Sequence, residues 1–255
     1  MSANPRRRRP IAGTIPPFTM AFQPIVDVIC GGVFAYEALV RGPNGEGAAE
    51  IFEQIADADR YDFDQQCRVR AVEVAAQIGL IERDACLSIN VLPNAVGESR
   101  SCVERTLNAA QNVGLPTERI IFEFTEGEPL ADHEELLWVI RNFREMGFRT
   151  AIDDFGAGYS GLTLLTRFQP DLIKLDMALI RNIDLDPVRR AVVGGILHMC
   201  EDLGIAVVAE GLESEGEFRA LRDLGLSLLQ GFLFAAPGVE TMPAPIWPNG
   251  SALAA

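Results

Sequence analysis

The sequence contains very little lysine and histidine, although it is rich in arginine. Its 255 residues include a single lysine, Lys174, and two histidines, against 21 arginines. The five cysteines show no Cys-x-x-Cys spacing, and their odd number leaves one unpaired. This distribution argues against a zinc centre built from cysteine and histidine, and against a disulfide framework. We therefore expect free thiols and a reducing, cytoplasmic setting.

Long apolar runs and an excess of positive charge are also missing. No run approaches the roughly 18 residues of a membrane-spanning helix, and the N-terminus lacks the apolar segment of a secretory signal. The formal net charge of −14 argues against binding to a nucleic-acid polymer. A phosphorylated small molecule remains compatible with this charge, because bound metal ions can supply local positive charge.

The single lysine admits two interpretations. A bias towards arginine could have left one lysine by chance. Alternatively, position 174 requires a compact ammonium group that a planar guanidinium cannot replace. The residues that surround it in the sequence pattern favour the second interpretation.

The predicted organisation is one barrel with a short segment on either side. Residues 1–19 include four consecutive arginines and are expected to form a flexible arm or linker. Residues 20–236 are expected to form the barrel, and the proline-rich residues 237–255 a peripheral tail.

Within the barrel, the pattern predicts eight strands. Strands over residues 20–28 and 33–41 flank Gly31-Gly32, which indicates an antiparallel hairpin. A helical region over 46–80 follows, with a break near residues 60–62. Strands then alternate with helices, and one long helix ends near Leu203. The remaining strands cover residues 86–92, 119–125, 149–153, 171–176, 205–210 and 226–234. This alternation predicts an α/β fold, a closed (β/α)8 TIM-like barrel with an antiparallel first strand; a doubly wound open sheet is the alternative.

Two adjacent carboxylates, Asp153 and Asp154, follow an apolar strand and precede a turn that contains Gly156 and Gly158. Side chains of a strand alternate between its faces, so both aspartates can reach one site only where the strand ends. Two carboxylates that lie close together repel unless a proton or cation sits between them. A divalent metal ion is the natural partner of such an oxygen cluster.

Polar residues recur at the strand ends, once for each strand–helix unit. In a barrel these ends face one opening, so the side chains should converge there. Any one of them alone could be a surface, turn or capping residue, but the recurrence favours a shared site. The set consists of Glu37, Asn90, Glu123 with Glu126, Asp153 with Asp154, Lys174, Glu210 with Glu213, and Gln230.

The order of these residues resembles the EAL domain family of cyclic di-GMP phosphodiesterases. The resemblance covers residues 18–236 and begins with Tyr-Glu-Ala-Leu-Val-Arg at 36–41, which carries the family's three-letter signature. It departs from the family in the segment Glu50–Glu53, which replaces Phe-Ile-Pro, and in Phe124, which stands where a smaller aliphatic residue is more common. The other matching motifs are Gln23–Ile25, Ser88–Asn90, Glu123–Glu126, Asp153–Ser160, Ile173–Asp176, Glu210–Glu213 and Gln230–Phe232.

The resemblance implies hydrolysis of cyclic di-GMP to linear 5′-pGpG by a homodimeric enzyme with two Mg²⁺ or Mn²⁺ ions, inhibited by Ca²⁺. An all-oxygen donor set also suits these hard cations better than zinc. The residues implied to hold the metals are Glu37, Asn90, Glu123, Asp153, Asp154 and Glu210. Glu210 could instead be the general base, and both roles stay open.

The remaining implied roles concern the substrate and the surroundings of the metals. Lys174 would hold the attacking water or a phosphate oxygen. Gln23, Arg41 and Gln230 would contact the substrate. Glu213 would support the metal site from behind, as would Glu126, which would also anchor the loop that follows Asp154.

Two other functions are compatible with the same residues. A non-catalytic module of this family would bind cyclic di-GMP or a protein partner as a receptor, but such modules typically lack a metal ligand or the lysine, and this chain has them all. A more distant alternative is another Mg²⁺-dependent barrel enzyme, such as a lyase that uses Lys174 as its base. Turnover of cyclic di-GMP to a linear dinucleotide would distinguish the three.

Overall fold

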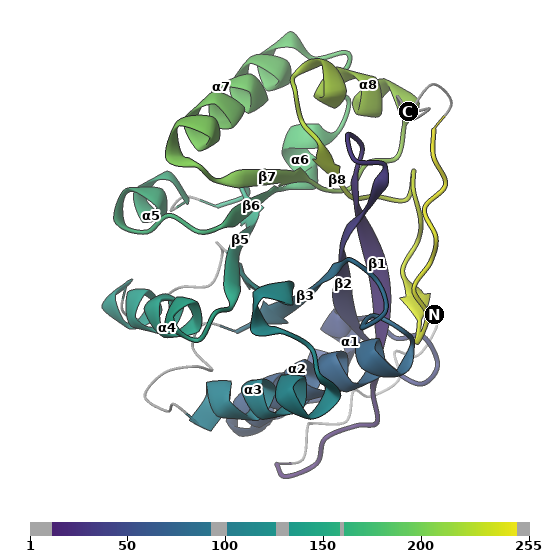
Figure 1. The fold of residues 1–255 in the computed structure, drawn as a ribbon, viewed down its shortest axis with the longest axis vertical. Helices are drawn as coiled ribbons and strands as arrows, with labels where there is room; N and C mark the ends of the chain where they lie inside the picture. Colours follow the sequence, from purple (N-terminus) through teal and green to yellow (C-terminus); the bar gives the residue numbers. More distant parts are fainter. Residues whose placement is uncertain (1–11, 93–100, 126–132, 159–160, 249–255) are drawn as a thin grey trace, which may run out of the picture.

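The computed structural model describes residues 12–92, 101–125, 133–158 and 161–248. In this part of the chain, eight strands close into a barrel that is surrounded by helices (Figure 1). Their order around the barrel follows the chain, and β8 and β2 both pair with β1. The strands are β1 (Thr19–Asp27), β2 (Gly32–Arg41), β3 (Cys86–Val91), β4 (Ile120–Thr125), β5 (Arg149–Phe155), β6 (Leu172–Leu175), β7 (Ala206–Ala209) and β8 (Leu228–Leu229).

The first strand runs against all its neighbours, as predicted. It pairs antiparallel with β2 from Thr19 opposite Arg41 to Asp27 opposite Gly32, and antiparallel with β8 at Val26 and Asp27. The pairs from β2–β3 to β7–β8 are parallel. The barrel is therefore closed, which excludes the open-sheet alternative. Because β1 is reversed, its N-terminal half lies at the end of the barrel where the other strands finish.

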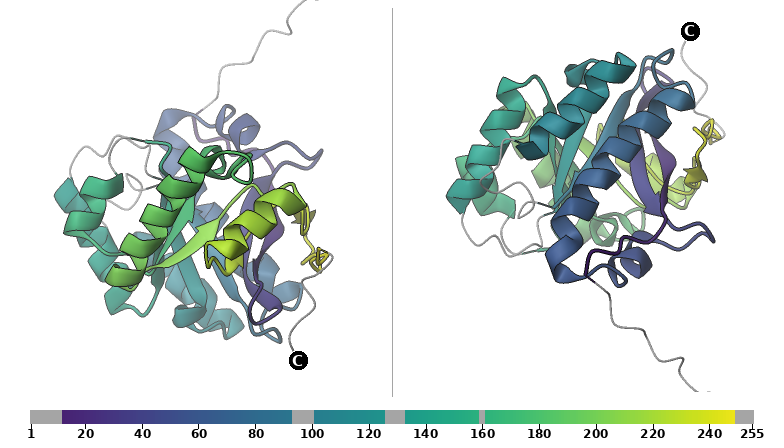
Figure 2. Two further views of the ribbon diagram at one scale, coloured as in Figure 1. Left: turned by 90° about the horizontal axis from the view of Figure 1, so that it is seen from above. Right: turned by 90° about the horizontal axis from the view of Figure 1, so that it is seen from below.

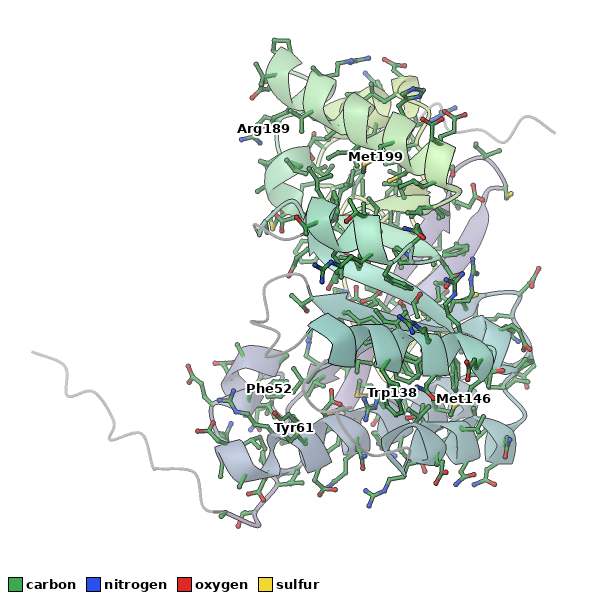
Figure 3. The ribbon with its side chains drawn as sticks, turned by 90° about the vertical axis from the view of Figure 1, so that its left-hand side faces the viewer. Phe52, Tyr61, Trp138, Met146, Arg189 and Met199 are labelled. Atoms are coloured by element: carbon green, nitrogen blue, oxygen red, sulfur yellow. The ribbon has the colours of Figure 1, made fainter. Side chains whose placement is uncertain are left out.

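Helices cover the outside of the barrel, with α7 and α8 on one side and α2 and α3 on the other (Figure 2). Tyr61 and Arg189, near the N-terminal ends of α2 and α7, lie on the same side of the molecule, opposite Met146, which follows α4 (Figure 3). The side on which Tyr61 and Arg189 lie is the mouth of the barrel, where the parallel strands end. The helices are α1 (Ala48–Phe52), α2 (Arg60–Gln77), α3 (Ser101–Val113), α4 (His133–Glu145), α5 (Gly161–Arg167), α6 (Met177–Ile180), α7 (Pro187–Leu203) and α8 (Glu215–Asp223).

The structure corrects two helix predictions. The break expected near residues 60–62 lies earlier, because α1 ends at Phe52 and α2 begins at Arg60, after a 3-10 turn over Asp57–Asp59. The long helix expected to end near Leu203 consists of α6 and α7. Between them, Asp186 caps α7 by accepting from the amides of Val188 and Arg189. Proline at the first position of α7 reinforces the break, because the residue before a proline disfavours helical geometry.

The last strand is also shorter than predicted. Residues 226–234 were expected to be extended, but β8 contains only Leu228 and Leu229. The chain then turns, and the amide of Phe234 donates to the carbonyl of Gly231. Gln230 therefore directly follows β8, at the mouth of the barrel.

Part of the predicted tail belongs to the sheet. Strand β9 (Gly238–Val239) pairs antiparallel with β1 at Ala21 and Phe22. The amide of Ile246 donates to the carbonyl of Phe234, and the rings of Phe234 and Trp247 meet edge to face at 6.2 Å. Figure 1 shows this yellow segment alongside β1. Residues 237–248 thus complete the wall of the barrel instead of lying apart from it.

The interior of the barrel is filled by a small apolar cluster, separate from the larger core between strands and helices. Seven of the eight strands contribute one buried residue each, so apolar side chains fill the part of the barrel that lies away from its mouth. The cluster consists of Ile25, Ala35, Ile121, Ala151, Leu172, Val208 and Leu228, with Cys86 of β3 packed against it. Among the described residues, no helix is long and apolar enough to cross a membrane.

Arg119, just before β4, fastens the loop that leads into β3. Its Nη2 donates to the carbonyls of Leu80, Arg83 and Ala85, at 2.8, 2.6 and 2.6 Å. Its Nε also donates to the carbonyl of Ala85, at 3.0 Å. A charged donor that serves several backbone carbonyls is worth more than a neutral hydrogen bond.

We predict that Arg119→Ala lowers the free energy of unfolding by about 2 kcal/mol, because it leaves these carbonyls without their donor. Urea denaturation measures the loss. Arg219→Ala is a matched control, since Arg219 is exposed and pairs with Glu215 one helical turn away; it should cost less than about 0.5 kcal/mol. Equal losses in the two variants would contradict this role of Arg119.

Candidate active site

A ring of polar side chains lies directly above the apolar cluster inside the barrel. Side chains two positions apart on a strand share a face, so each residue of the ring stands one layer above a residue of the cluster. Ala35 is followed by Glu37, Ile121 by Glu123, and Ala151 by Asp153. The same step leads from Leu172 to Lys174, from Val208 to Glu210, from Leu228 to Gln230 and, on the reversed β1, from Ile25 back to Gln23.

Lys174 lies at the centre of this ring, with a side chain only 2% exposed. Its ammonium group contacts four carboxylates from four different strands or strand ends. The distances from Nζ are 2.5 Å to Glu210, 2.8 Å to Glu123, 3.1 Å to Asp153 and 3.5 Å to Glu37. The prediction that this lysine points into a carboxylate cluster agrees with this arrangement.

Amide and hydroxyl donors hold the carboxylates in place. Glu37 accepts from the side-chain amides of Asn90, at 3.0 Å, and Gln230, at 2.6 Å. Glu123 accepts from the hydroxyl of Ser88, at 2.5 Å. Each of these two glutamates therefore has partners on two sides, including Lys174, and their oxygens have fixed directions.

Gln23 connects the ring to the segment that follows β8. Its Nε2 donates to the carbonyl of Ala235, at 3.0 Å, and its Oε1 accepts from Gln230, at 3.2 Å. The oxygen of the other amide, Oε1 of Gln230, is buried, and it accepts no hydrogen bond from the residues that the structure describes. A buried acceptor of this kind at the edge of a cleft is available to a ligand.

The two aspartates reach the same site through an irregularity in β5. The strand was expected to end at Asp153, but it continues to Phe155 with a shift of register between Ile152 and Phe155. Asp154 occupies the bulge and has a φ of 54°, in the left-handed region that residues other than glycine seldom adopt. Carboxylate oxygens of Asp153, Asp154 and Glu210 all lie within 4.8 Å of one another.

Burial and mutual repulsion shift the ionisation of these groups. Burial raises the pKa of Glu210 to about 8, against the opposing effect of Lys174. Burial is also the main cause that raises the pKa of Asp154, followed by the charges of Asp153 and Asp176. Burial alone would lower the pKa of Lys174, but the surrounding carboxylates outweigh it and raise that pKa well above its usual value. The lysine therefore stays charged, and Glu210 and Asp154 keep a proton to a higher pH than usual unless more positive charge arrives.

The ring opens into a cleft of about 250 Å³. Its floor contains Glu37, Asp153, Lys174 and Glu210, and its rim includes three residues that the sequence reasoning gave no role: Leu39, Met177 and Phe232. Ser88 was missed as well, although it stands two residues before Asn90 and so shares its face. The strand period could have identified Ser88 and also Leu39, which stands two residues after Glu37 on β2, whereas Met177 and Phe232 lie outside the strands.

Two other predicted site residues, Arg41 and Glu213, make different contacts. Arg41 lies at the mouth end of β2, where its guanidinium donates to the carbonyl of Val40, at 2.7 Å. Glu213 lines the cleft but pairs with Arg181, at 2.8 Å. Glu126 lies outside the described residues.

The donor set fits divalent metal ions. The described residues of the cleft floor offer carboxylate and amide oxygens, and Asp153, Asp154 and Glu210 bring three carboxylates to one place. One ammonium cannot balance the five carboxylates of the cluster; burial, with the charges of Asp153 and Glu37 added to it, raises the pKa of Glu210. Hard divalent cations take oxygen ligands of this kind.

The fold is a closed α/β barrel with a ring of carboxylates around one lysine at its mouth, the end at which barrels of this class carry their functional sites. The model of the EAL domain matches residues 14–237. The chain belongs to the EAL domain family.

Relatives with established names are larger than this chain. The blue light- and temperature-regulated antirepressor BluF of Escherichia coli is 35% identical over 229 residues, which cover 90% of this chain and 56% of BluF. The cyclic di-GMP phosphodiesterase RocR of Pseudomonas aeruginosa is 36% identical over 154 residues, covering 60% of this chain and 39% of RocR. The chain thus spans about half or less of the length of these relatives.

Solved structures share the fold over most of the chain. A standalone EAL protein from Vibrio cholerae, in its c-di-GMP bound form, has a TM-score of 0.87 at 46% identity, covering 92% of this chain and 98% of that one. BlrP1 of Klebsiella pneumoniae, in a complex with manganese and cyclic di-GMP, has a TM-score of 0.86 at 39% identity, covering 93% of this chain and 59% of BlrP1.

The raised pKa of Glu210 predicts how pH affects stability. Between the usual carboxyl value of 4.5 and about 8, the folded protein retains a proton at Glu210 that the unfolded chain has lost. The free energy of unfolding of metal-free protein should therefore fall as pH rises through this window. A Mn²⁺ ion bound at these carboxylates would replace the proton, so Mn²⁺ should raise the melting temperature more at about pH 8 than at about pH 5.5.

Thermal melts at both pH values, with and without Mn²⁺, measure this dependence. Glu210→Gln is the matched control, because its neutral amide has no proton to lose. A metal-free wild type whose melting temperature changes with pH as that of Glu210→Gln does would contradict the prediction.

Proposed function

We propose that this chain hydrolyses cyclic di-GMP to linear 5′-pGpG, using two divalent metal ions, and so lowers the level of this second messenger. The observation that carries the proposal is the ring of carboxylates around the buried Lys174, in a chain of the EAL family. The names of RocR as a cyclic di-GMP phosphodiesterase and of the Vibrio cholerae structure as a c-di-GMP bound form support the choice of substrate.

The proposed metals are Mg²⁺ or Mn²⁺. Glu37, Asn90, Glu123 and Asp153 would hold one ion. Asp153, Asp154 and Glu210 would hold the other. When bound, such ions lower the pKa of a water and offset the charge that develops on the phosphate.

The residues of the chain would position the reacting groups. The ammonium of Lys174 has three donors, enough to hold the attacking water or a phosphate oxygen together with two carboxylates. Glu210, with a raised pKa, could serve as a metal ligand or accept the proton of the water, and both roles stay open. Gln23 and Gln230 present their amides to the cleft, and Arg41 would contact a phosphate at the mouth. Glu213 and Glu126 would support the surrounding loops.

A receptor function is the alternative. BluF is named an antirepressor, so a protein of this family can have a regulatory role. A receptor would bind cyclic di-GMP and release it unchanged. Chromatography of cyclic di-GMP after incubation with the protein and Mg²⁺ decides between the two: a new peak with the mobility of 5′-pGpG supports hydrolysis, and an unchanged nucleotide contradicts it.

Hydrolysis should require Mg²⁺ or Mn²⁺ and stop in excess EDTA. The carboxylates repel the negatively charged phosphate unless cations lie between them. Ca²⁺ should support little turnover, since its longer and looser coordination does not suit a tight two-metal geometry. Initial rates with each metal at equal concentration test this. Full activity in EDTA would exclude the metal assignment.

Lys174→Arg should lose at least about a hundredfold in kcat, the scale of a positioned catalytic group, while the barrel stays folded. A guanidinium is planar and larger, so it would displace a water or a metal from the ring. Circular dichroism checks the fold. Arg189→Lys, on the outer helix α7, is a matched control that should keep the wild-type rate. A near wild-type rate for Lys174→Arg would make the single lysine a compositional accident.

A further inference from the structure

A buried ion pair on α2 contacts the backbone directly after β3. Asp64 and Arg68 stand one helical turn apart, and both side chains are almost completely buried. Nη1 of Arg68 lies 2.9 Å from Oδ2 of Asp64. The other oxygen of this aspartate, Oδ1, accepts from the amide of Leu92, at 3.1 Å. The carboxylate therefore joins the outer helix to the mouth end of β3.

Asn90, two residues before Leu92, is the most exposed residue of the proposed metal ligands. Glu37, Glu123 and Asp153 are buried, whereas Asn90 is exposed. Neighbouring side chains therefore do less to confine it. The position of its amide depends on its hydrogen bond to Glu37 and on the course of the backbone that carries it.

The neighbouring strands hold this part of the backbone unequally. The ladder between β2 and β3 ends at Ile89, while the ladder between β3 and β4 continues to Val91. On the side of β2, strand pairing thus stops one residue before the proposed ligand. The hydrogen bond from Leu92 to Asp64 is a second anchor for the end of the strand.

Arg68 makes this anchor difficult to remove by a single substitution. Its guanidinium forms the ion pair with Asp64 and no hydrogen bond with other described residues. A buried charge that loses its partner is costly, so a variant of either residue alone would leave an uncompensated charge. Substitutions that test the contact with Leu92 must therefore remove both charges together.

We propose that Asp64 is a positioning residue for metal binding. Through the amide of Leu92 it holds the end of β3, and so keeps the oxygen of Asn90 directed towards an ion bound by the carboxylates of the ring. This inference rests on the proposed function and adds to its metal site a residue of the outer helix α2. Removing a partner that orients a metal ligand typically lowers metal affinity by about 10- to 100-fold.

Equilibrium binding of Mn²⁺ to the protein without nucleotide tests the proposal, with free Mn²⁺ measured by electron paramagnetic resonance. Two double variants remove both charges and differ at one position only. Asp64→Leu/Arg68→Met has no acceptor for the amide of Leu92, whereas Asp64→Asn/Arg68→Met keeps a side-chain oxygen there. We expect the first to bind Mn²⁺ about tenfold more weakly at one site, and the second to bind it with nearly the wild-type affinity.

Two comparisons separate positioning from a general effect on stability. With Asn90→Ala added, the two double variants should bind Mn²⁺ equally, because the contact acts through Asn90. Asp171→Leu is the matched control, since Asp171 accepts from the amide of Thr150, at 2.8 Å, at the other end of the barrel. It should lower the melting temperature and leave the affinity for Mn²⁺ unchanged.

Equal Mn²⁺ affinities of the two double variants would overturn the proposal, as would a difference that persists when Asn90→Ala is added. Should circular dichroism show that Asp64→Leu/Arg68→Met does not fold, Leu92→Pro takes its place. This variant removes the donor while the ion pair stays, and a wild-type affinity for Mn²⁺ would then refute the anchor. A protein that binds Mn²⁺ as expected but leaves cyclic di-GMP intact refutes the proposed function and not this inference.

Discussion

The charge balance around Lys174 is the constraint on which the site depends. An ammonium that is almost completely buried must be paired, and here four carboxylates surround it at 2.5–3.5 Å. With Asp154 the cluster holds five carboxylates, so one lysine cannot satisfy it. Removing one partner of a buried ion pair leaves an uncompensated charge, which is costly. The cluster therefore stays together through protons or bound cations. Burial, and after it the charges of Asp153 and Glu37, raises the pKa of Glu210 accordingly.

The barrel meets this constraint by separating packing from chemistry in two adjacent layers. The apolar cluster fills the part of the interior that lies away from the mouth, and its packed side chains hold the strands in place. Two residues further, roughly 7 Å along each strand, the same faces present the polar ring. Since Leu172 and Lys174 share one short strand, as Val208 and Glu210 share a strand and its end, the rigid packing of the first residue orients the second. Precise placement of so many charges would be difficult on loops alone.

The sequence predicted the layers better than it predicted their irregularities. The closed barrel, the reversed first strand and the positions of Glu37, Glu123, Lys174 and Glu210 follow from strand period and recurrence. The bulge at Asp154 could not be predicted, because alternation describes regular strands, and a bulge depends on how neighbouring strands pair. The break between α6 and α7 was signalled by Asp186-Pro187, but apolar residues on both sides obscured it. The contact between Gln23 and Ala235 joins residues 212 positions apart, and no local pattern encodes it.

The reversed first strand explains why the segment after the barrel is part of the fold. Because β8 is short, it pairs with β1 only at Val26 and Asp27. The half of β1 near the mouth would otherwise have an open edge, which β9 covers at Ala21 and Phe22. Gln23 lies between these two pairings, and its amide joins the carbonyl of Ala235 to Gln230, which in turn holds Glu37. A continuous set of hydrogen bonds thus runs from the outer wall of the barrel to a carboxylate that contacts Lys174, so the closure of the sheet and the geometry of the site depend on the same few residues.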